Sequence, residues 1–296
     1  MNAGAMRARD LALALLIILV WGVNFVVIKM GLGGMPPLLL AATRFMLAAF
    51  PALLFFRAPK VPLKLYLAFG LTMSLGQFAF LFSAIHLGMP SGLASLVLQS
   101  QSFFTLLFTV LWLKEKWRGN QLLGLLLAVG GLVLVGCAHG KAMPLVGFLL
   151  TVEAAAMWAC GNLASRAVGR HGPINPLAFV VWASLVPILP FLLLSWLIEG
   201  PGAMTQALQH LSLRTVGAVA YIAWASTLFG YAGWNYLLSR YPVNRVAPFS
   251  LLVPLVGLSA GWLVFGERLG VLHLAGGVLL MTGLLVNLFA ARWFSR

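Results

Sequence analysis

The sequence is poor in charged residues, which make up 8% of it, whereas hydrophobic residues make up 62%. A soluble domain of 296 residues cannot bury so much apolar surface, so lipid must be the solvent for much of this chain. Acidic residues are the scarcest charged type, with 5 Asp and Glu against 19 Lys and Arg. The 2 cysteines, Cys137 and Cys160, lie within apolar runs and form no CxxC motif, which argues against a disulfide framework and favours roles in packing.

The sequence also lacks the motifs of metalloenzymes. It contains no HExxH motif and no cluster of metal ligands, and its few acids are scattered. We therefore expect no catalytic residues, no metal and no cofactor. The net charge of +14 would suggest nucleic-acid binding in a soluble protein. Here the basic residues lie in short connectors between apolar runs, which indicates orientation in a membrane and no nucleic-acid partner.

Long apolar runs dominate the chain, and a membrane-spanning helix needs about 20 such residues, which predicts about ten spans. The predicted spans are Leu11–Met30, Pro36–Phe56, Leu63–His86, Ser91–Leu113, Asn120–Cys137, Pro144–Val168, Ile174–Ile198, Leu213–Leu238, Val243–Phe265 and Val271–Ala290. The runs are continuous and do not alternate, which excludes a membrane β-barrel. The first run follows Arg7 and Arg9 as in a signal peptide, but it lacks a small-residue cleavage site, so we expect a retained span.

Lys and Arg are distributed unevenly between the two sides that these spans define. One side holds Arg7, Arg9, Arg57, Lys60, Lys64, Lys114, Lys116, Arg118, Arg166, Arg170, Arg240, Arg245, Arg292 and Arg296. The other side holds only Lys29, Lys141, Arg214 and Arg268. Because cytoplasmic loops carry the excess of Lys and Arg, we expect both termini to be cytoplasmic.

An internal repeat organises the chain, because Ser91–Gly119 returns as Val243–Gly270. The residues that align are Glu115 with Glu267, Gly124 with Gly276, and Gly131 with Gly283. The repeat divides the chain into units at 10–137 and 144–291, each with five of the predicted spans. Because five is odd, the second unit must enter the membrane from the opposite side. The predicted fold is therefore an all-α polytopic membrane protein of ten transmembrane helices in two inverted five-helix repeats, an architecture that carriers use to open to each side in turn.

Several short motifs carry a resemblance to a known family. They are the WGVNF stretch that starts at Trp21, the ARF stretch around Arg44, and the E-x(8)-G spacing that starts at Glu115 and again at Glu267. With its doubling, the chain resembles the EamA family of the drug/metabolite transporter superfamily. It is most similar to bacterial exporters of cysteine and O-acetylserine, and more distantly to aromatic amino-acid exporters of the YddG type.

The resemblance implies ten helices around a central cavity and efflux of small metabolites from the bacterial inner membrane. The partners it implies are a small-molecule substrate, most simply an amino acid or a similar metabolite, and the lipid bilayer. A drug, nucleobase or sugar derivative is an alternative substrate. A monomer is compatible with the sequence, which leaves the oligomeric state open.

Polar side chains inside spans are costly unless they face a partner or water, so they are the candidates for a site. The predicted substrate-binding residues are Asn24, Gln77, Gln99, Trp158, Asn162, Trp224 and Tyr231. An amide both donates and accepts hydrogen bonds, which suits a zwitterion. The alternatives are hydrogen bonds between helices for the amides and an interfacial belt for the aromatic residues. Trp224 and Tyr231 fall on one stripe of a regular helix.

Two charges lie deep in predicted spans, Arg44 and Glu153, each about 12 Å in at 1.5 Å per residue. They could pair, which would lower the cost of both. Alternatively, Arg44 could meet a substrate carboxylate or bond to backbone carbonyls. Glu153 is the candidate for any proton-coupling carboxylate, and facilitated diffusion without coupling is the alternative.

Glycines and prolines predict packing and bending of the helices. We interpret the aligned pairs Gly124/Gly131 and Gly276/Gly283 as contacts between closely approaching helices. Pro248 removes a backbone hydrogen bond in the ninth span, which predicts a kink or hinge. A channel would show charged rings or a carbonyl filter, and neither is present, so a carrier is favoured over a channel or a membrane-embedded enzyme.

Overall fold

The computed structural model describes residues 6–115, 119–140, 142–172 and 174–289, and nearly all of this part is helical. The first half contains α1 (Ala8–Leu32), α2 (Pro37–Ala49), η1 (Ala52–Leu54), α3 (Leu63–Phe69), η2 (Gly70–Gly76), α4 (Gln77–His86), α5 (Ser91–Val97), η3 (Leu98–Ser100), α6 (Gln101–Leu113) and α7 (Gly119–Cys137). The second contains α8 (Leu145–Val168), η4 (Gly169–His171), α9 (Pro176–Ala183), α10 (Ile188–Leu194), η5 (Ser195–Glu199), α11 (Pro201–Gln209), α12 (Leu213–Ala220), η6 (Tyr221–Phe229), α13 (Gly230–Arg240), α14 (Val243–Val246), η7 (Ala247–Leu252), α15 (Val253–Phe265) and α16 (Val271–Phe289).

Eight helices of the described chain are long and apolar enough to cross a membrane. Two shorter apolar helices, Gln121–Cys137 and Val271–Asn287, fall within the fifth and tenth predicted spans. The prediction of an all-helical, multi-pass membrane protein is confirmed. Within the described ranges the one β-type pairing is an isolated bridge between Gly140 and Met143. The connector between Glu199 and Leu213 contains the short helix α11.

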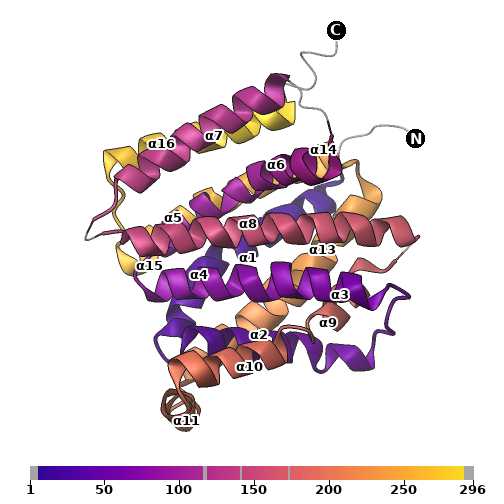
Figure 1. Ribbon diagram of the computed structural model, residues 1–296, viewed down its shortest axis with the longest axis vertical. Helices are drawn as coiled ribbons and strands as arrows, with labels where there is room; N and C mark the ends of the chain where they lie inside the picture. Colours follow the sequence, from indigo (N-terminus) through magenta and orange to yellow (C-terminus); the bar gives the residue numbers. More distant parts are fainter. Residues whose placement is uncertain (1–5, 116–118, 141, 173, 290–296) are drawn as a thin grey trace.

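The helices of the two halves pack against each other rather than in separate bundles (Figure 1). α1 packs against α12, α13 and α15 of the second half, and α8 packs against α3, α4 and α6 of the first. α2 packs on α10, and α5 packs on α15. The labels in Figure 1 show that the α5–α6 segment and the α14–α15 segment run in opposite directions.

α7 and α16 form a separate pair along one edge of the bundle (Figure 1). A Cβ atom added to Gly124 would lie 2.8 Å from the carbonyl oxygen of Gly283, and one added to Gly276 would lie 2.6 Å from that of Gly131. These distances leave no room for a side chain, so glycine is required for the backbones to approach this closely. The predicted packing role of these glycines is confirmed.

Four of the long helices contain a break at corresponding places. Leu63–His86 and Leu213–Arg240 pass through the π-helical segments η2 and η6. Ser91–Leu113 and Ala247–Phe265 contain the 3₁₀ segments η3 and η7. The predicted break at Pro248 is present, because this residue lies in η7 and lacks the N–H group that an α-helix needs. Such irregular turns release backbone groups and often occur at functional sites.

Two glutamates cap helix N-termini where the backbone N–H groups have no partner within the helix. Glu199 accepts hydrogen bonds from the N–H groups of Leu38 (2.6 Å) and Leu39 (3.2 Å) at the start of α2. Glu267 accepts from the N–H groups of Ser91 and Gly92, both at 2.9 Å, at the start of α5. A carboxylate at this position satisfies the free donors and complements the helix dipole.

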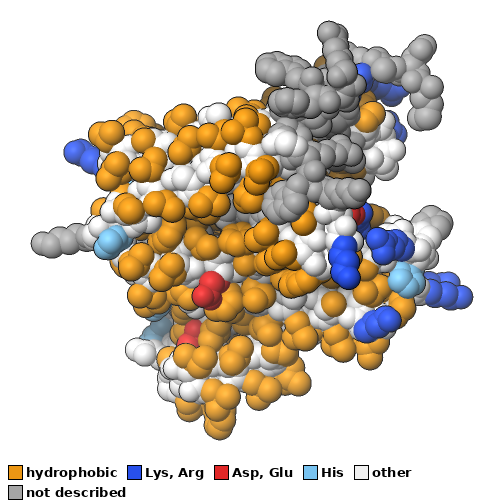
Figure 2. Space-filling view, turned by 45° about the horizontal axis from the view of Figure 1, so that its top comes forward, with side chains coloured by type: hydrophobic (Ala, Val, Ile, Leu, Met, Phe, Trp, Pro, Cys, Tyr) orange, Lys and Arg blue, Asp and Glu red, His pale blue; other side chains and the backbone are white. Residues whose placement is uncertain are grey.

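The outer surface is mainly apolar, as expected for a protein that lipid surrounds. On the face shown in Figure 2, hydrophobic side chains cover most of the described surface, and most Lys and Arg side chains gather at one end, at the right of the view. Many large hydrophobic residues are correspondingly exposed, among them Leu54, Leu126 and Leu263.

Candidate functional site

A cavity of about 760 Å³ lies in the centre of the bundle. Both halves line it, the first through α1, α4 and α6 and the second through α8, α13 and η7. Its volume lies within the range of about 300–1,000 Å³ that is typical of small-molecule sites. At one end the lining residues Ser165, Gly169 and Gly172 are exposed, so the mouth lies where α8 ends.

The start of α1 marks the same end of the bundle as the mouth. Asp10, in the first turn of α1, accepts a hydrogen bond of 2.7 Å from Tyr241, which directly follows α13. Lys29 lies at the other end of α1, about 28 Å away at 1.5 Å per residue. The surroundings of Lys29 therefore define the end of the bundle opposite the mouth.

At that opposite end, Glu267 holds several elements together. Lys29 Nζ lies 2.7 Å from Glu267 Oε1, and the same carboxylate caps α5 through Ser91 and Gly92. Burial alone raises the pKa of Glu267. The hydrogen bond from Lys29, the two backbone N–H groups and the Lys29 charge outweigh burial and hold the pKa below its usual value of 4.5. The pair thus remains ionised at neutral pH and ties α1, α5 and the loop after α15 together.

A second ion pair occupies the corresponding place near the mouth. Arg166 Nη2, in the last turn of α8, lies 2.6 Å from Glu115 Oε1, in the connector after α6. Both side chains are about half exposed, at 48% for Arg166 and 47% for Glu115, whereas Glu267 is only 10% exposed. Each pair joins a glutamate of one half to the first helix of the other half, but the pair far from the mouth is the more buried.

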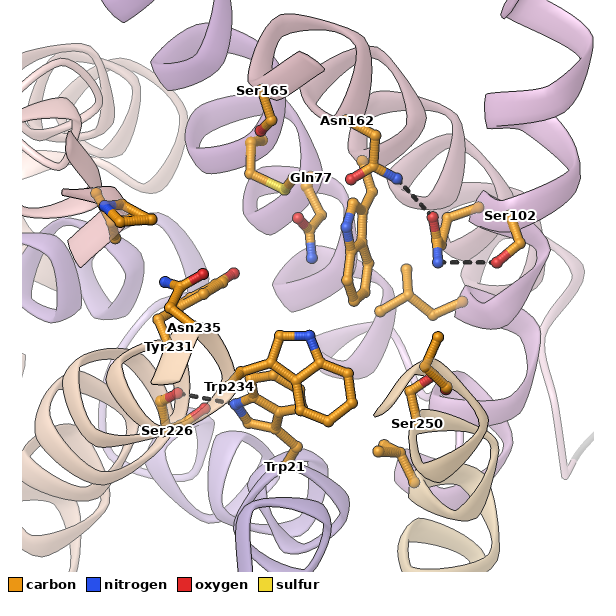
Figure 3. A pocket seen from close by; sticks show the side chains of 18 of the residues that line it. Trp21, Gln77, Ser102, Asn162, Ser165, Ser226, Tyr231, Trp234, Asn235 and Ser250 are labelled. Atoms are coloured by element: carbon orange, nitrogen blue, oxygen red, sulfur yellow. Dashed lines mark hydrogen bonds between the residues drawn. The ribbon is translucent and has the colours of Figure 1, made fainter. Parts of the chain in front are cut away.

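An aromatic group forms one wall of the cavity (Figure 3). The Trp21 ring lies 6.0 Å from the Tyr231 ring in an edge-on arrangement and 5.2 Å from the Trp234 ring. Trp21 Nε1 donates a hydrogen bond of 3.0 Å to the carbonyl oxygen of Ser226 in η6. Trp234 lines the cavity beside Trp21. The wall offers ring faces to an apolar group.

Amide side chains form the facing wall, and three of them, Asn162, Gln101 and Gln99, are already bonded. Asn162 Nδ2 donates to Gln101 Oε1 (2.8 Å) and to Thr105 Oγ1 (3.0 Å). Gln99 Nε2 donates to the carbonyl oxygen of Ser250 (3.1 Å), which connects the two 3₁₀ breaks. Asn162 and Gln99 thus bond neighbouring helices and also line the cavity.

Two further amides are buried at the cavity without such partners. Asn24 is 8% exposed and Gln77 is 4% exposed, and both line the cavity. The side-chain oxygens of both accept no hydrogen bond within the described residues. Figure 3 shows Gln77 facing the open space between Asn162 and Tyr231. Trp158, the counterpart of Trp21 in the repeat, also lines the cavity.

Arg44 also borders the cavity and is 3% exposed. Its Nη2 donates a hydrogen bond of 3.0 Å to Thr227 Oγ1, and its guanidinium carbon lies 3.9 Å from the centre of the Phe78 ring. The pair with Glu153, one of the alternatives for Arg44, is not formed. Arg44 lies between α4 and η6, whereas Glu153 lies on the exposed face of α8 and does not line the cavity.

The prediction that Trp224 lines the cavity requires a correction. The regular-helix stripe assigned it to the cavity beside Tyr231, but its side chain is 48% exposed and its Nε1 donates to the carbonyl oxygen of Leu47 (3.1 Å). The cavity lining does not include it. The reason is that Trp224 lies within the π-helical segment η6, where wider turns shift each side chain away from its α-helical direction.

The sequence also gave no indication of several residues that line the cavity. Met73, Phe69 and Phe179 belong to it, but as apolar residues within apolar runs they resemble every other core position. Ser165 could have been identified, because it lies three residues after Asn162 and therefore on the same face of α8.

Comparison with known proteins identifies a family that the chain matches. The model of the EamA-like transporter family matches the chain twice, at residues 9–137 and 145–289. A probable amino-acid metabolite efflux pump of Salmonella typhimurium strain LT2 is 50% identical over 290 residues, which cover 97% of each chain. A protein of the same description from Escherichia coli K12 is 48% identical over 291 residues, again 97% of each chain.

The fold has a counterpart among solved structures as well. One crystal structure of a protein matches with a TM-score of 0.64 and covers 98% of this chain and 100% of its own, at 21% sequence identity, a likeness of fold alone. The family match spans both halves, and the two relatives share about half of their residues with this chain over nearly its full length. The resemblance noted from the WGVNF and E-x(8)-G motifs is thus confirmed, and this chain belongs to the EamA-like transporter family.

Proposed function

We propose that this protein is a secondary transporter of the bacterial inner membrane that exports amino acids or their derivatives by alternating access. The observation that carries the proposal is a central cavity between the two halves, with a mouth at one end and the partly buried Lys29–Glu267 pair at the opposite end of the bundle. A carrier needs such a site, accessible from one side at a time.

The proposal includes ten transmembrane helices in two inverted repeats, 10–137 and 144–291. The contacts between the halves support this arrangement, because they are reciprocal. Gly124 meets Gly283 as Gly131 meets Gly276, which is the pattern of two antiparallel helices related by a two-fold axis. α6 and α15 both end on a left-handed residue, Lys114 with φ 55° and Gly266 with φ 63°.

The two ion pairs provide the means of alternation. Glu267 binds Lys29 of the first half, and Glu115 binds Arg166 of the second half, at opposite ends of the bundle. In the proposed cycle, the halves rock about the cavity so that one pair tightens as the other separates. The distribution of Lys and Arg supports a cytoplasmic mouth, and both chain termini on the cytoplasmic side, so the state described here faces inward.

The proposed substrate class rests on chemistry and on the relatives. Two relatives at 48% and 50% identity are described as probable amino-acid metabolite efflux pumps. The cavity combines an aromatic wall at Trp21 with buried amides at Asn24 and Gln77. Such a combination suits a small solute with an apolar part and a zwitterionic part.

Transport by purified protein in liposomes tests the proposal. The panel consists of cysteine, O-acetylserine, threonine, methionine and phenylalanine, with a sugar phosphate as the control solute. We expect saturable uptake with counterflow for at least one amino acid. Unitary currents would identify a channel, chemical conversion of the solute would identify an enzyme, and movement of the sugar phosphate alone would overturn the substrate class.

The orientation has its own test. Single cysteines placed in the connectors 114–119 and 266–270, in a background without Cys137 and Cys160, are labelled in intact cells by a thiol reagent that does not cross membranes. The inverted repeat predicts labelling from outside at 266–270 and not at 114–119. Labelling of both connectors from one side would refute it.

A further inference from the structure

Arg44 has more hydrogen-bonding capacity than the protein around it uses. A guanidinium carries five N–H donors. One of them, on Nη2, binds Thr227, whereas Nε and Nη1 have no hydrogen-bond partner within the described residues. Donors left unpaired in a buried position are costly, and charged ones more so. The side chain therefore carries two buried, unpaired nitrogens next to the cavity that it lines.

The charge of Arg44 is also uncompensated. All 5 acidic residues of the chain are described, and none of them forms an ion pair with Arg44. The acids are otherwise engaged or distant: Asp10 with Arg9 and Tyr241, Glu115 with Arg166, Glu267 with Lys29, Glu199 at the start of α2, and Glu153 on the exposed face of α8. A cation buried in the membrane without an acid calls for an anion from elsewhere.

The contacts of Arg44 leave an approach for a planar anion. Phe78 covers a face of the guanidinium at 3.9 Å, a favourable cation–π contact that uses none of the N–H groups. The N–H groups lie in the guanidinium plane, and two of them on one edge match the two oxygens of a carboxylate. A carboxylate is therefore the anion that fits this geometry best among those on amino-acid metabolites.

Acceptors for a positive group lie around the same cavity. The side-chain oxygens of Asn24 and Gln77 are buried and have no donor within the described residues. Gln77 directly precedes Phe78, which contacts Arg44, and Asn24 lies one helical turn after Trp21 in the aromatic wall. A primary ammonium group carries three N–H donors, so two amide oxygens would satisfy most of them.

We infer that Arg44 binds the carboxylate of the transported amino acid and that Asn24 and Gln77 receive its ammonium group, with the side chain directed to the wall at Trp21 and Tyr231. This inference rests on the proposed function, since it names the recognition of the substrate within the same cavity. It assigns the substrate class as free α-amino acids with both charged groups unblocked. Carboxamides, α-esters and N-acetylated forms are poorer substrates with a higher KM.

The test uses the full chain in liposomes with cysteine, methionine and phenylalanine, each also supplied as its carboxamide and its N-acetyl derivative. We expect the wild type to prefer the free amino acid over both. Arg44→Gln should raise the KM for the free amino acid about 10- to 100-fold, which is the loss typical of hydrogen bonds to a charged group. The KM for the carboxamide should stay almost unchanged. Arg44→Lys should give an intermediate loss, because it keeps the charge without the paired donors. Gln77→Met should instead reduce the preference for the free amino acid over its N-acetyl derivative.

Arg214→Gln is the matched control, because it removes the same charge from an exposed position outside the cavity. The ratio of acid to carboxamide transport does not depend on how much variant folds, so a purely structural role of Arg44 would leave it unchanged. Thermal protection of the wild type by the free amino acid but not by its carboxamide provides a readout without any variant. Equal protection by both forms, or an unchanged ratio in Arg44→Gln, would overturn the inference. A wild type that moves none of the amino acids would instead refute the proposed function.

Discussion

Replacing Glu267 by Gln should open the end of the bundle that lies opposite the mouth. The carboxylate is 10% exposed and accepts charged or backbone hydrogen bonds from Lys29, Ser91 and Gly92. Breaking a fully buried pair costs about 3–5 kcal/mol. Because Lys29 is 33% exposed, solvent screening reduces this, and we expect about 2–3 kcal/mol. That corresponds to an increase of about 30- to 150-fold in the population open at this end.

The accessibility of one engineered cysteine measures this population. Ser95→Cys, in a background without Cys137 and Cys160, lies in the cavity lining just beyond the closed end. A maleimide that does not cross membranes, added from the side of Glu267, should label it much faster in Glu267→Gln. Glu115→Gln is the matched control, because its pair with Arg166 is half exposed and contributes only about 0–1 kcal/mol. Equal labelling rates in the two variants would refute the reasoning.

The same pair has a defined pH dependence. The pKa of Glu267 lies below its usual value of 4.5 in the folded protein, so folding favours the ionised form. Its contribution is therefore complete above pH 4.5 and is lost as the pH falls through the lowered pKa. The difference in melting temperature between the wild type and Glu267→Gln should stay constant from pH 8 to pH 6 and shrink below pH 4.5. A difference that vanished near neutral pH would contradict the assignment.

Three further substitutions have clear expected outcomes. Gly131→Ala should lower the melting temperature, because its Cβ would lie 2.6 Å from the carbonyl oxygen of Gly276 and overpacking costs about 1–3 kcal/mol, whereas Gly130→Ala meets only a leucine methyl at 3.2 Å and should be tolerated. Trp224→Ala should leave the KM for transport unchanged in liposomes, since the residue lies outside the cavity lining; a large rise in KM would return it to the site. Glu153→Gln should retain transport and its pH profile, and a flattened profile would make this exposed carboxylate a coupling group.

The features predicted well from the sequence are those that local spacing determines. The glycines seven residues apart, Gly124 with Gly131, fall on one face of any regular helix, so their packing role follows from position alone. The break at Pro248 follows from a missing N–H group. The apolar runs determine the helices, because in lipid the backbone must satisfy its own hydrogen bonds.

The features that were missed depend on contacts between distant segments or on helix irregularity. The Lys29–Glu267 pair joins residues 238 positions apart, and no local pattern identifies such a partner. The Arg44–Glu153 pair was one alternative that similar depth allowed, but depth does not fix the direction of a side chain around its helix. Trp224 was misassigned because a period of 3.6 residues does not hold through a π-helical segment.

The seam between α7 and α16 has an evolutionary consequence. Because Gly124 meets Gly283 in the same way as Gly131 meets Gly276, each helix presents an equivalent surface to its mate. A half-length ancestor with these glycines would have formed the same seam with an antiparallel sister molecule. Duplication and fusion of its gene would then have preserved an interface that already existed, and a side chain at a glycine of either helix would block the shared seam.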